Sequence, residues 1–377
     1  MSAQAPRRVM GHGTVYLRPD GRWSAQVAVE GRRRTVYGRT QAECVAKLQA
    51  LQHAVTGGLP APDGRATVAR YLDMWLGQVA ARVRPRTMRH YRYMVGLISA
   101  QMGRVKLAKL SPQDVASMLA RMQASGLSPQ TCSLARATLR TALADAERGG
   151  LVARNSARLA SAPRVPHQQP RILSPEQAQA VIDALPDAGL RRLATVAVHT
   201  GLRQGELLGL RWSDVDWQAG ELHVTQALQR LDGEYALVEV KSRTSRRSVP
   251  LTAAAVEALA QERQSQLEAR LAAGSRWREP ISGLAFATAT GAPRSGSAIT
   301  HQFADALSAA GLPAMHWHHL RHAFAGLMLA SGSDLGTVSS LLGHTSVTLT
   351  ASTYAGVMPS LKRQAADRLG RLLQRPV

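Results

Sequence analysis

The first part of the chain alternates apolar and polar residues with the period of two that is typical of β-strands. Asp20-Gly21 is a turn signal between two such runs, and Thr40 followed by Glu43 fits a capping box that opens a helix. The pattern therefore predicts a small domain at residues 10–57, made of a three-stranded sheet and one helix. The predicted strands are residues 13–17, 23–29 and 32–37.

In the next part of the chain, apolar residues recur every three or four positions, as they do on one face of an α-helix. Residues 57–66 in front of it are rich in glycine and proline and are typical of a linker. Ser111-Pro112 places a serine at an N-cap and a proline at the first helical position. These signals predict a compact all-α domain at residues 65–155, followed by a proline-rich connection.

The remainder of the chain combines both periods. Ser174 and Gln177 form a capping box at the start of a new helix, and Asp232-Gly233 is a hairpin signal between two apolar strands. We predict a mixed α+β domain at residues 170–377, so the whole chain is multidomain and mainly α with small β-sheets. The strands expected in this domain are residues 221–225, 235–240 and 246–251.

The chain carries a large excess of positive charge. Its 377 residues include 47 Lys and Arg against 25 Asp and Glu, which gives a formal net charge of +22. Such a charge favours a polyanionic partner, and nucleic acid is the first candidate. A basic protein from an arginine-rich genome, without such a partner, is the alternative. Cys44 and Cys132 are too few and too far apart for a disulfide framework or a zinc site.

The sequence indicates neither a signal peptide nor a membrane span. Residues 1–8 have no apolar core, and no apolar run reaches the roughly 18 residues that a span requires. We therefore expect a cytoplasmic protein without a membrane partner.

Arginines cluster in both N-terminal domains. Residues 32–34 are three consecutive arginines at the start of a predicted strand, and a sheet that carries them could lie in a DNA major groove. A second cluster surrounds the start of a predicted helix, where phosphates could dock. A solvated strand edge and a solvated helix face are the alternatives. The second cluster consists of Arg82, Arg84, Arg86, Arg89 and Arg92.

Five short motifs in the last domain carry candidate chemistry. An arginine beside a glycine at a helix junction lies near free backbone N–H groups, which favour an anion. A lysine after a strand can swing toward a ligand, and histidines, an arginine and a tyrosine follow on short helices. The motifs are Gly201-Leu202-Arg203-Gln204-Gly205-Glu206, Lys241, His318-His319-Leu320-Arg321-His322, Leu342-Gly343-His344 and Tyr354.

In their order and spacing these motifs resemble those of the tyrosine recombinases, the family of lambda-type phage integrases. Each motif alone is modest evidence, but the five in this order within one basic chain are highly specific. The resemblance implies a catalytic tyrosine-recombinase domain at residues 170–377 that ends in a helix. Residues 10–57 resemble an integrase arm-type DNA-binding domain, and residues 65–155 resemble the helical, SAM-like core-type DNA-binding domain.

The resemblance implies a reaction at one DNA phosphate. Tyr354 would attack it and form a 3′-phosphotyrosyl bond, and a phenol with a reference pKa of about 10 needs a base or electrostatic help to do so. His318 is the implied base, and Lys241 is the implied acid that protonates the departing 5′-oxygen. No ATP, metal or other cofactor is implied, because the phosphodiester energy stays in the protein–DNA bond.

The resemblance also implies which side chains hold the phosphate. Arg203 and Arg321 would bind its two non-bridging oxygens, since a guanidinium group stays charged and its planar fork matches phosphate geometry. His344 would donate another hydrogen bond to the phosphate. Glu206 is the implied supporting carboxylate of the site.

The chain departs from the family pattern at His319, where Asp or Gly is common. The assignment of His318 therefore rests on its spacing of three from Arg321. A metal-binding cluster is the alternative interpretation of these crowded histidines, although no cysteine or carboxylate joins them with the spacing of metal ligands.

The implied function is site-specific recombination that integrates or excises a phage or other mobile element. The expected partners are double-stranded DNA attachment sites, three further copies of the chain in a homotetramer on DNA, an accessory DNA-bending protein and an excision factor. The expected location is the bacterial cytoplasm, at the nucleoid. The N-terminal arm domain favours an integrase over a chromosome-dimer recombinase, and a DNA-binding relative without catalysis is the alternative.

An apolar stripe follows Tyr354 in the sequence. A helix with such a stripe could dock on a neighbouring subunit, and self-packing on its own domain is the alternative. The stripe consists of Leu361, Ala365, Leu369 and Leu372.

Overall fold

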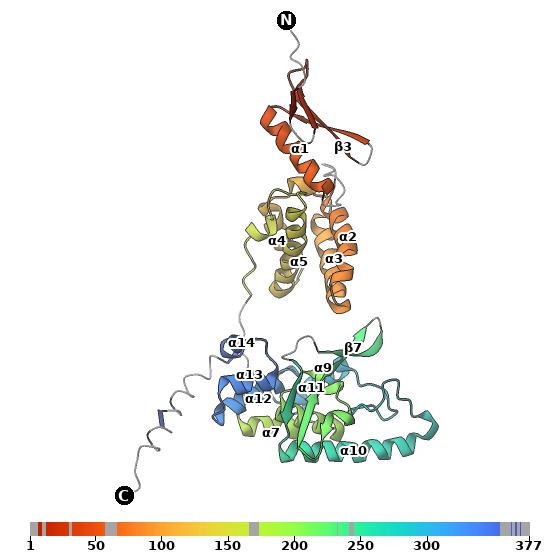
Figure 1. Ribbon diagram of the computed structural model, residues 1–377. Coiled ribbons are helices and arrows are strands. Elements are labelled where there is room, and N and C mark those ends of the chain that lie inside the picture. Colours follow the sequence, from red (N-terminus) through yellow and green to blue (C-terminus); the bar gives the residue numbers. More distant parts are fainter. Residues whose placement is uncertain are drawn as a thin grey trace. The chain divides into compact units, whose positions relative to one another are not determined.

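The computed structural model shows a chain that divides into two compact units, residues 1–166 and 167–377 (Figure 1). The structure describes residues 7–9, 13–29, 32–56, 66–165, 173–231, 233–240 and 245–354, together with residues 363, 366, 367 and 370. The predicted apolar stripe after Tyr354, which consists of Leu361, Ala365, Leu369 and Leu372, lies wholly outside the described residues. In the part of the chain that is described, no helix is both long and apolar enough to cross a membrane.

The first unit begins with an antiparallel sheet and one helix, α1 (Gln41–Thr56). The three predicted strands are confirmed, and a fourth short strand that the sequence pattern did not predict pairs with the first of them. Its core is small and is formed by Val15, Ala25, Cys44 and Leu48. The strands, in sheet order, are β1 (Arg7–Val9), β2 (Gly13–Leu17), β3 (Trp23–Val29) and β4 (Arg32–Gly38).

The helical part of the first unit is built on capped amphipathic helices. Ser111 and Asp114 form a complete capping box, as the serine-proline signal predicted. Trp75 is fully buried and its Nε1 donates to Asp145 at 2.7 Å, which satisfies the polar end of a large apolar ring. The helices are α2 (Val68–Val79), α3 (Pro85–Met102), α4 (Pro112–Ala124), α5 (Pro129–Arg148) and α6 (Ser156–Leu159), with 3₁₀ turns at Ala80–Arg82 and Leu107–Lys109.

The second unit combines helices with two small sheets around one large core, which confirms the predicted mixed α+β character. The helices α12 to α14, which carry the last motifs, follow one another and pack together (blue in Figure 1). The helices are α7 (Pro175–Asp183), α8 (Ala188–Thr200), α9 (Gln204–Leu208), α10 (Ala253–Ala273), α11 (Gly296–Ala309), α12 (His319–Ala330), α13 (Leu335–Leu342) and α14 (Val347–Thr353).

The sheets of the second unit differ from the expected hairpin in one respect. The turn at Gly233 is present, with φ of 97°, but the strand before it is β7 (Gln226–Leu231), which the sequence pattern did not predict. It pairs with β8 (Glu234–Glu239) as a separate two-stranded sheet. The predicted strand β6 (Glu221–Val224) lies instead in a second sheet, between β5 (Val215–Asp216) and β9 (Arg247–Pro250).

Two glycines end the helices that frame the motifs. Gly201 ends α8 with φ of 62° and Gly343 ends α13 with φ of 63°, both in the left-handed region that glycine adopts without a Cβ clash. At Gly201 the space is also restricted, since a Cβ would lie 2.3 Å from Cδ1 of Phe324 on α12. Glycine at this position therefore lets α8 end directly against α12.

Candidate active site

Arg321 is the most enclosed charged residue of the motifs. It lies on the first turn of α12 and is 4% exposed. Its Nη1 donates to the carbonyl oxygen of Gly201 at 2.6 Å, and its Nη2 donates to that of Leu342 at 2.5 Å. The guanidinium group thus joins the ends of two helices that are far apart in sequence.

Arg203 binds a carbonyl next to one that Arg321 binds. Its Nη2 donates to the carbonyl oxygen of Gly343 at 3.1 Å, and its Nη1 forms a 2.7 Å ion pair with Glu206. Glu206 is buried on α9 and also accepts the backbone N–H of Arg203 at 3.0 Å, which closes the first turn of that short helix. Glu206 therefore pairs with Arg203, and Arg203 and Arg321 bind neighbouring carbonyls.

A third arginine, which the sequence analysis did not select, completes this network. Arg247 on β9 forms a 2.8 Å ion pair with Glu206, and both side chains are almost fully buried, at 5% and 3% exposed. Its Nε donates to the carbonyl oxygen of Leu341 at 2.5 Å. Three consecutive carbonyls at the end of α13 (Leu341, Leu342 and Gly343) are thus each bound by a different arginine. A signal for Arg247 existed, since an arginine facing the core from a strand needs a buried partner.

The electrostatics of this arginine network favour an anion. Burial alone would raise the pKa of Glu206, but the hydrogen bond and charge of Arg247 and the charge of Arg203 outweigh it and hold that pKa below its usual value. Burial and the charge of Arg203 lower the pKa of Arg321 to about 9, so this side chain stays protonated at neutral pH. Arg203 and Arg247 pair with Glu206 and Arg321 binds only carbonyls, so three cations against one carboxylate leave net positive charge, which suits a phosphate.

His344 lies immediately beyond the arginine network. Its Nδ1 is 2.8 Å from Oγ1 of Thr350 on α14, which fixes the ring. Burial, followed by the positive charges of Arg321 and Arg203, lowers the pKa of His344 to about 4. The ring is therefore neutral at neutral pH and can donate one hydrogen bond from its other nitrogen if Nδ1 is the acceptor.

Tyr354 is buried in an apolar cluster at the end of α14. It is 1% exposed and packs with Phe324, Leu342 and neighbouring residues. Its hydroxyl is 2.9 Å from Nδ1 of His322, and the two rings meet edge to face with centroids 5.8 Å apart. Burial raises the pKa of Tyr354 to about 12, against which the charge of Arg321 acts only in part. Sequence analysis placed His322 in a motif but gave it no role.

His318 packs on His322, the residue that contacts the phenol of Tyr354. Its ring meets that of His322 edge to face, with centroids 4.9 Å apart, and it is exposed on its outer side. Desolvation by the surrounding protein lowers the pKa of His318, and the charges of Arg321 and Arg203 act in the same direction. His318 therefore lies among the motif residues in neutral form.

Lys241 lies outside the described residues, between the end of β8 at Glu239 and the start of β9 at Arg247. The strand that leads to it and the strand that leaves it are both described. β9 carries Arg247 into the network around Glu206, and Lys241 precedes Arg247 by six residues in the sequence. Its role stays a prediction.

The crowded histidines are engaged with each other and with the backbone. The Nδ1 of His319 is 2.9 Å from the backbone nitrogen of His316, and the two rings stack with centroids 5.8 Å apart. Within the described ranges, no three His, Cys, Asp or Glu side chains are grouped so that they could hold a metal ion.

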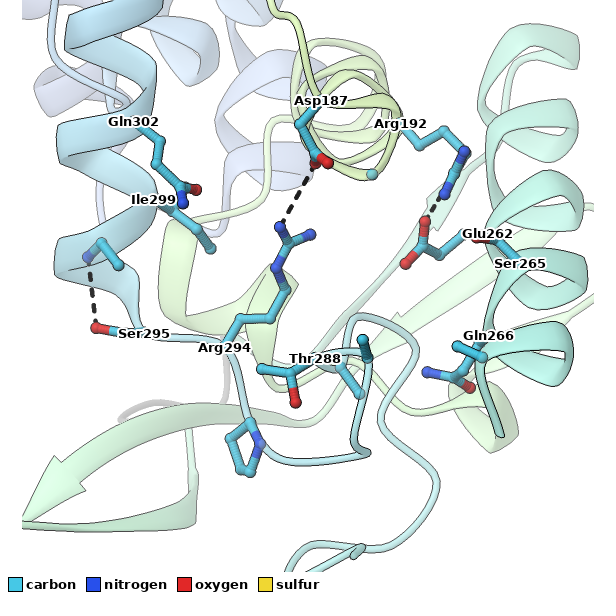
Figure 2. A pocket seen from close by; sticks show the side chains of 16 residues that line it. Asp187, Arg192, Glu262, Ser265, Gln266, Thr288, Arg294, Ser295, Ile299 and Gln302 are labelled. Atoms are coloured by element: carbon cyan, nitrogen blue, oxygen red, sulfur yellow. Dashed lines mark hydrogen bonds and ion pairs between the residues drawn. The ribbon is translucent and has the colours of Figure 1, made fainter. Parts of the chain in front are cut away.

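A pocket of about 530 Å³ lies away from the arginine network in this unit, between α8, α10 and α11 (Figure 2). Arg192 and Glu262 form a 2.7 Å ion pair in its wall. Nη2 of Arg294 lies 3.7 Å from Oδ1 of Asp187. The two arginines and the two carboxylates balance in charge, so this pocket lacks the net positive charge of the arginine network.

Comparison with known proteins agrees with the motifs. A model of the phage integrase family matches residues 171–360. An integrase of Streptomyces ambofaciens is 30% identical, over 84% of this chain and 83% of that protein. A tyrosine recombinase XerC-like protein of Caldanaerobacter subterraneus is 28% identical, over 90% of this chain and 92% of that protein.

Two solved structures show the same fold. The Tn1549 transposon integrase in complex with transposon right end DNA has a TM-score of 0.69 at 19% identity and covers 80% of this chain and 99% of that one. A lambda integrase tetramer bound to a Holliday junction has a TM-score of 0.57 at 21% identity and covers 89% of this chain and 96% of that one.

Proposed function

Because this chain belongs to the phage integrase family, the tyrosine recombinases, we propose that it integrates and excises a mobile DNA element by cutting and rejoining DNA strands. The observation that carries the proposal is the meeting of Arg203 and Arg321 at the neighbouring carbonyls of Gly343 and Leu342. They bring two separate motifs to one place with net positive charge. A single DNA phosphate fits that charge and the forked geometry of two guanidinium groups.

In the proposed reaction, Tyr354 attacks the phosphorus and forms a 3′-phosphotyrosyl bond. The bond to the 5′-oxygen breaks, and Lys241 gives that oxygen a proton. A 5′-hydroxyl from a partner strand reverses the step and rejoins the DNA. The energy of the phosphodiester is retained in the protein–DNA bond, so the cycle needs no ATP.

Arg203, Arg321 and His344 hold the phosphate in this proposal. A guanidinium group carries five N–H donors, so an arginine that binds backbone carbonyls keeps donors for phosphate oxygens. Their positive charge offsets the negative charge that builds up on the phosphate oxygens during attack. Glu206 and Arg247 then keep Arg203 and the end of α13 in place.

The proposed partners are double-stranded DNA attachment sites and three further copies of the chain. The net charge of +22 and the similarity to integrases that were solved on DNA support the DNA partner. The tetramer bound to a Holliday junction supports the assembly, and the helix expected after Tyr354 would link its subunits. An accessory DNA-bending protein and an excision factor complete the proposal, together with a place in the bacterial cytoplasm at the nucleoid.

The sheet at the start of the chain favours an integrase over a chromosome-dimer recombinase. The domain limits 10–57, 65–155 and 170–377 follow the same proposal, with arm-type, core-type and catalytic functions in that order.

The test begins by sequencing the DNA junctions that form when the protein is expressed beside its native locus, which gives the attachment site. A nicked suicide duplex with that site should then yield a covalent protein–DNA band, with or without EDTA. Tyr354→Phe should remove the band and keep DNA binding. A band that survives in Tyr354→Phe rejects Tyr354 as the nucleophile. Full binding by the wild type without any band favours the non-catalytic DNA-binding relative.

The role of Lys241 has its own test. Lys241→Ala should slow cleavage of ordinary DNA by about 10²-fold to 10⁴-fold, the usual contribution of a general acid. A substrate with a 5′-bridging phosphorothiolate has a leaving group that needs no proton, so it should restore cleavage. Absence of this rescue would reject Lys241 as the acid.

A further inference from the structure

The hydroxyl of Tyr354 already has a possible proton acceptor. Nδ1 of His322 lies 2.9 Å from the phenolic oxygen, within the range for proton transfer between a nucleophile and its base. The two rings pack edge to face and Tyr354 is 1% exposed, so the contact is partly buried. A hydrogen bond between the proposed nucleophile and an imidazole is the arrangement that general base catalysis requires.

His318, the base that the family resemblance implies, is placed differently. Its ring packs on His322 rather than on the phenol, and its outer side is exposed. Among the described residues, the hydrogen-bond partner of the Tyr354 hydroxyl is therefore His322 and not His318. This order favours His318 as a group on the phosphate side of the site.

We propose that Nδ1 of His322 takes the phenolic proton of Tyr354 when that residue attacks the scissile phosphate. The inference rests on the proposed function. In the forward step the O–H bond of Tyr354 breaks and an N–H bond forms on His322, while the phenolic oxygen bonds to phosphorus. The 5′-oxygen leaves with a proton from Lys241. In the rejoining step each proton returns along the same path.

The surroundings of His322 suit this role. Burial lowers the pKa of His322 to about 4, and electrostatic interactions with His318, His319, Arg321 and His344 act in the same direction. The imidazole is therefore neutral at neutral pH and has a lone pair to offer. A phosphate bound by the arginines brings negative charge close to His322 and raises that pKa. The base becomes stronger only when the substrate is present.

Two substitutions separate proton transfer from simple packing. His322→Asn places Oδ1 where Nδ1 was, so it can still accept the hydrogen bond but cannot take the proton. His322→Ala removes both functions. His319→Asn is the matched control for packing, because the His319 ring lies edge to face on His322, with centroids 6.1 Å apart, but bonds the backbone of His316 and not the phenol.

The readout is single-turnover cleavage of the 5′-bridging phosphorothiolate substrate as a function of pH. Its leaving group needs no proton, so Lys241 no longer contributes to the pH dependence, and the variants show whether the acid-side ionisation belongs to His322. We expect the wild-type rate to fall as the pH is lowered. His322→Asn should be slower by about 10²-fold to 10⁴-fold, and its rate should no longer depend on pH in that range. DNA binding and His319→Asn cleavage should stay within a few-fold of wild type.

Three results would overturn the inference. One is a His322→Asn rate equal to wild type, and another is a wild-type rate that does not fall in acid. The third is loss of the acid-side pH dependence in His318→Asn with its retention in His322→Asn. A wild-type rate that does not fall in acid rejects the inference even if a His322 variant proves too unstable to assay. Failure of the wild type to form any covalent complex would instead reject the proposed function.

Discussion

The two halves of the candidate site are held in different ways. On the arginine side, Arg203, Arg247 and Arg321 are each fixed by two or more hydrogen bonds to a buried carboxylate or to backbone carbonyls. On the tyrosine side, Tyr354 has apolar packing and one side-chain hydrogen bond, to His322. From this difference we expect the proposed phosphate-binding half to be built before DNA arrives, whereas the proposed nucleophile, Tyr354, can leave its apolar cluster.

The largest effect on stability is expected from the arginine side. Arg247→Met should lower the free energy of unfolding by about 3–5 kcal/mol, because it leaves the buried Glu206 short of one partner. Arg246→Met is the matched control, since the Arg246 side chain is 56% exposed and pairs with Glu239, which is 79% exposed. That control should cost less than about 1 kcal/mol. Urea unfolding measures both, and equal costs would contradict the picture of a fixed network.

The next effect is on cleavage. Arg321→Lys keeps the charge but loses the fork that reaches both Gly201 and Leu342, so we expect covalent cleavage to slow by about 10²-fold to 10³-fold. Arg276→Lys, on the exposed surface of the same unit, should cleave at the wild-type rate. A lysine at position 321 that supports normal cleavage would show that charge alone is sufficient there.

Acid should weaken the tyrosine side before the arginine side. His322 and His344 have pKa values lowered to about 4 in the fold, against 6.5 for the unfolded chain. Between these values the unfolded state binds more protons, so their stabilising contribution is complete above 6.5 and is lost as the pH falls to 4. Glu206, whose pKa is lowered, keeps its contribution until the pH falls through that lowered value.

Melting temperature as a function of pH measures this difference. His344→Asn and His322→Asn should each flatten the decline between pH 6.5 and 4, because the group that gains a proton on unfolding is gone. A decline that stays as steep in both variants would place the acid-sensitive groups elsewhere in the protein.

The smallest effect is expected from the phenolic hydroxyl itself. Tyr354→Phe keeps the ring in its apolar cluster and loses one hydrogen bond, so the free energy of unfolding should fall by only about 0.5–1.5 kcal/mol. Tyr354→Ala, which empties the same space, should cost about 3–5 kcal/mol. If Tyr354→Phe costs as much as Arg247→Met, the two halves are equally fixed and the comparison fails.

Local signals predicted much of the fold. Serine-proline caps marked helix starts such as that of α4, and Gly201 marked the helix junction at the end of α8. Strand β7 was missed because its sequence, Gln-Ala-Leu-Gln-Arg-Leu, has no β-branched or aromatic residue. Its place is set by pairing with β8, a contact that propensity does not describe.

Motif order named residues of the candidate site, but not the contacts between them. Arg203 and Arg321 were selected from local patterns, and the structure brings them to neighbouring carbonyls. Arg247 was missed because its importance lies in ion pairing with Glu206, 41 positions away, and in a bond to Leu341, 94 positions away. The link between His322 and Tyr354 likewise depends on how α12 and α14 pack.

The hydrogen bonds from three arginines to the carbonyl end of α13 affect how the protein releases DNA. The end of a helix carries about half a negative charge, so these oxygens act as built-in counterions. A bare group of three cations would hold a phosphate tightly and release a rejoined duplex slowly. Here each arginine already donates a hydrogen bond to a backbone carbonyl, which weakens its binding of a phosphate. Weaker binding favours release of DNA after both integration and excision.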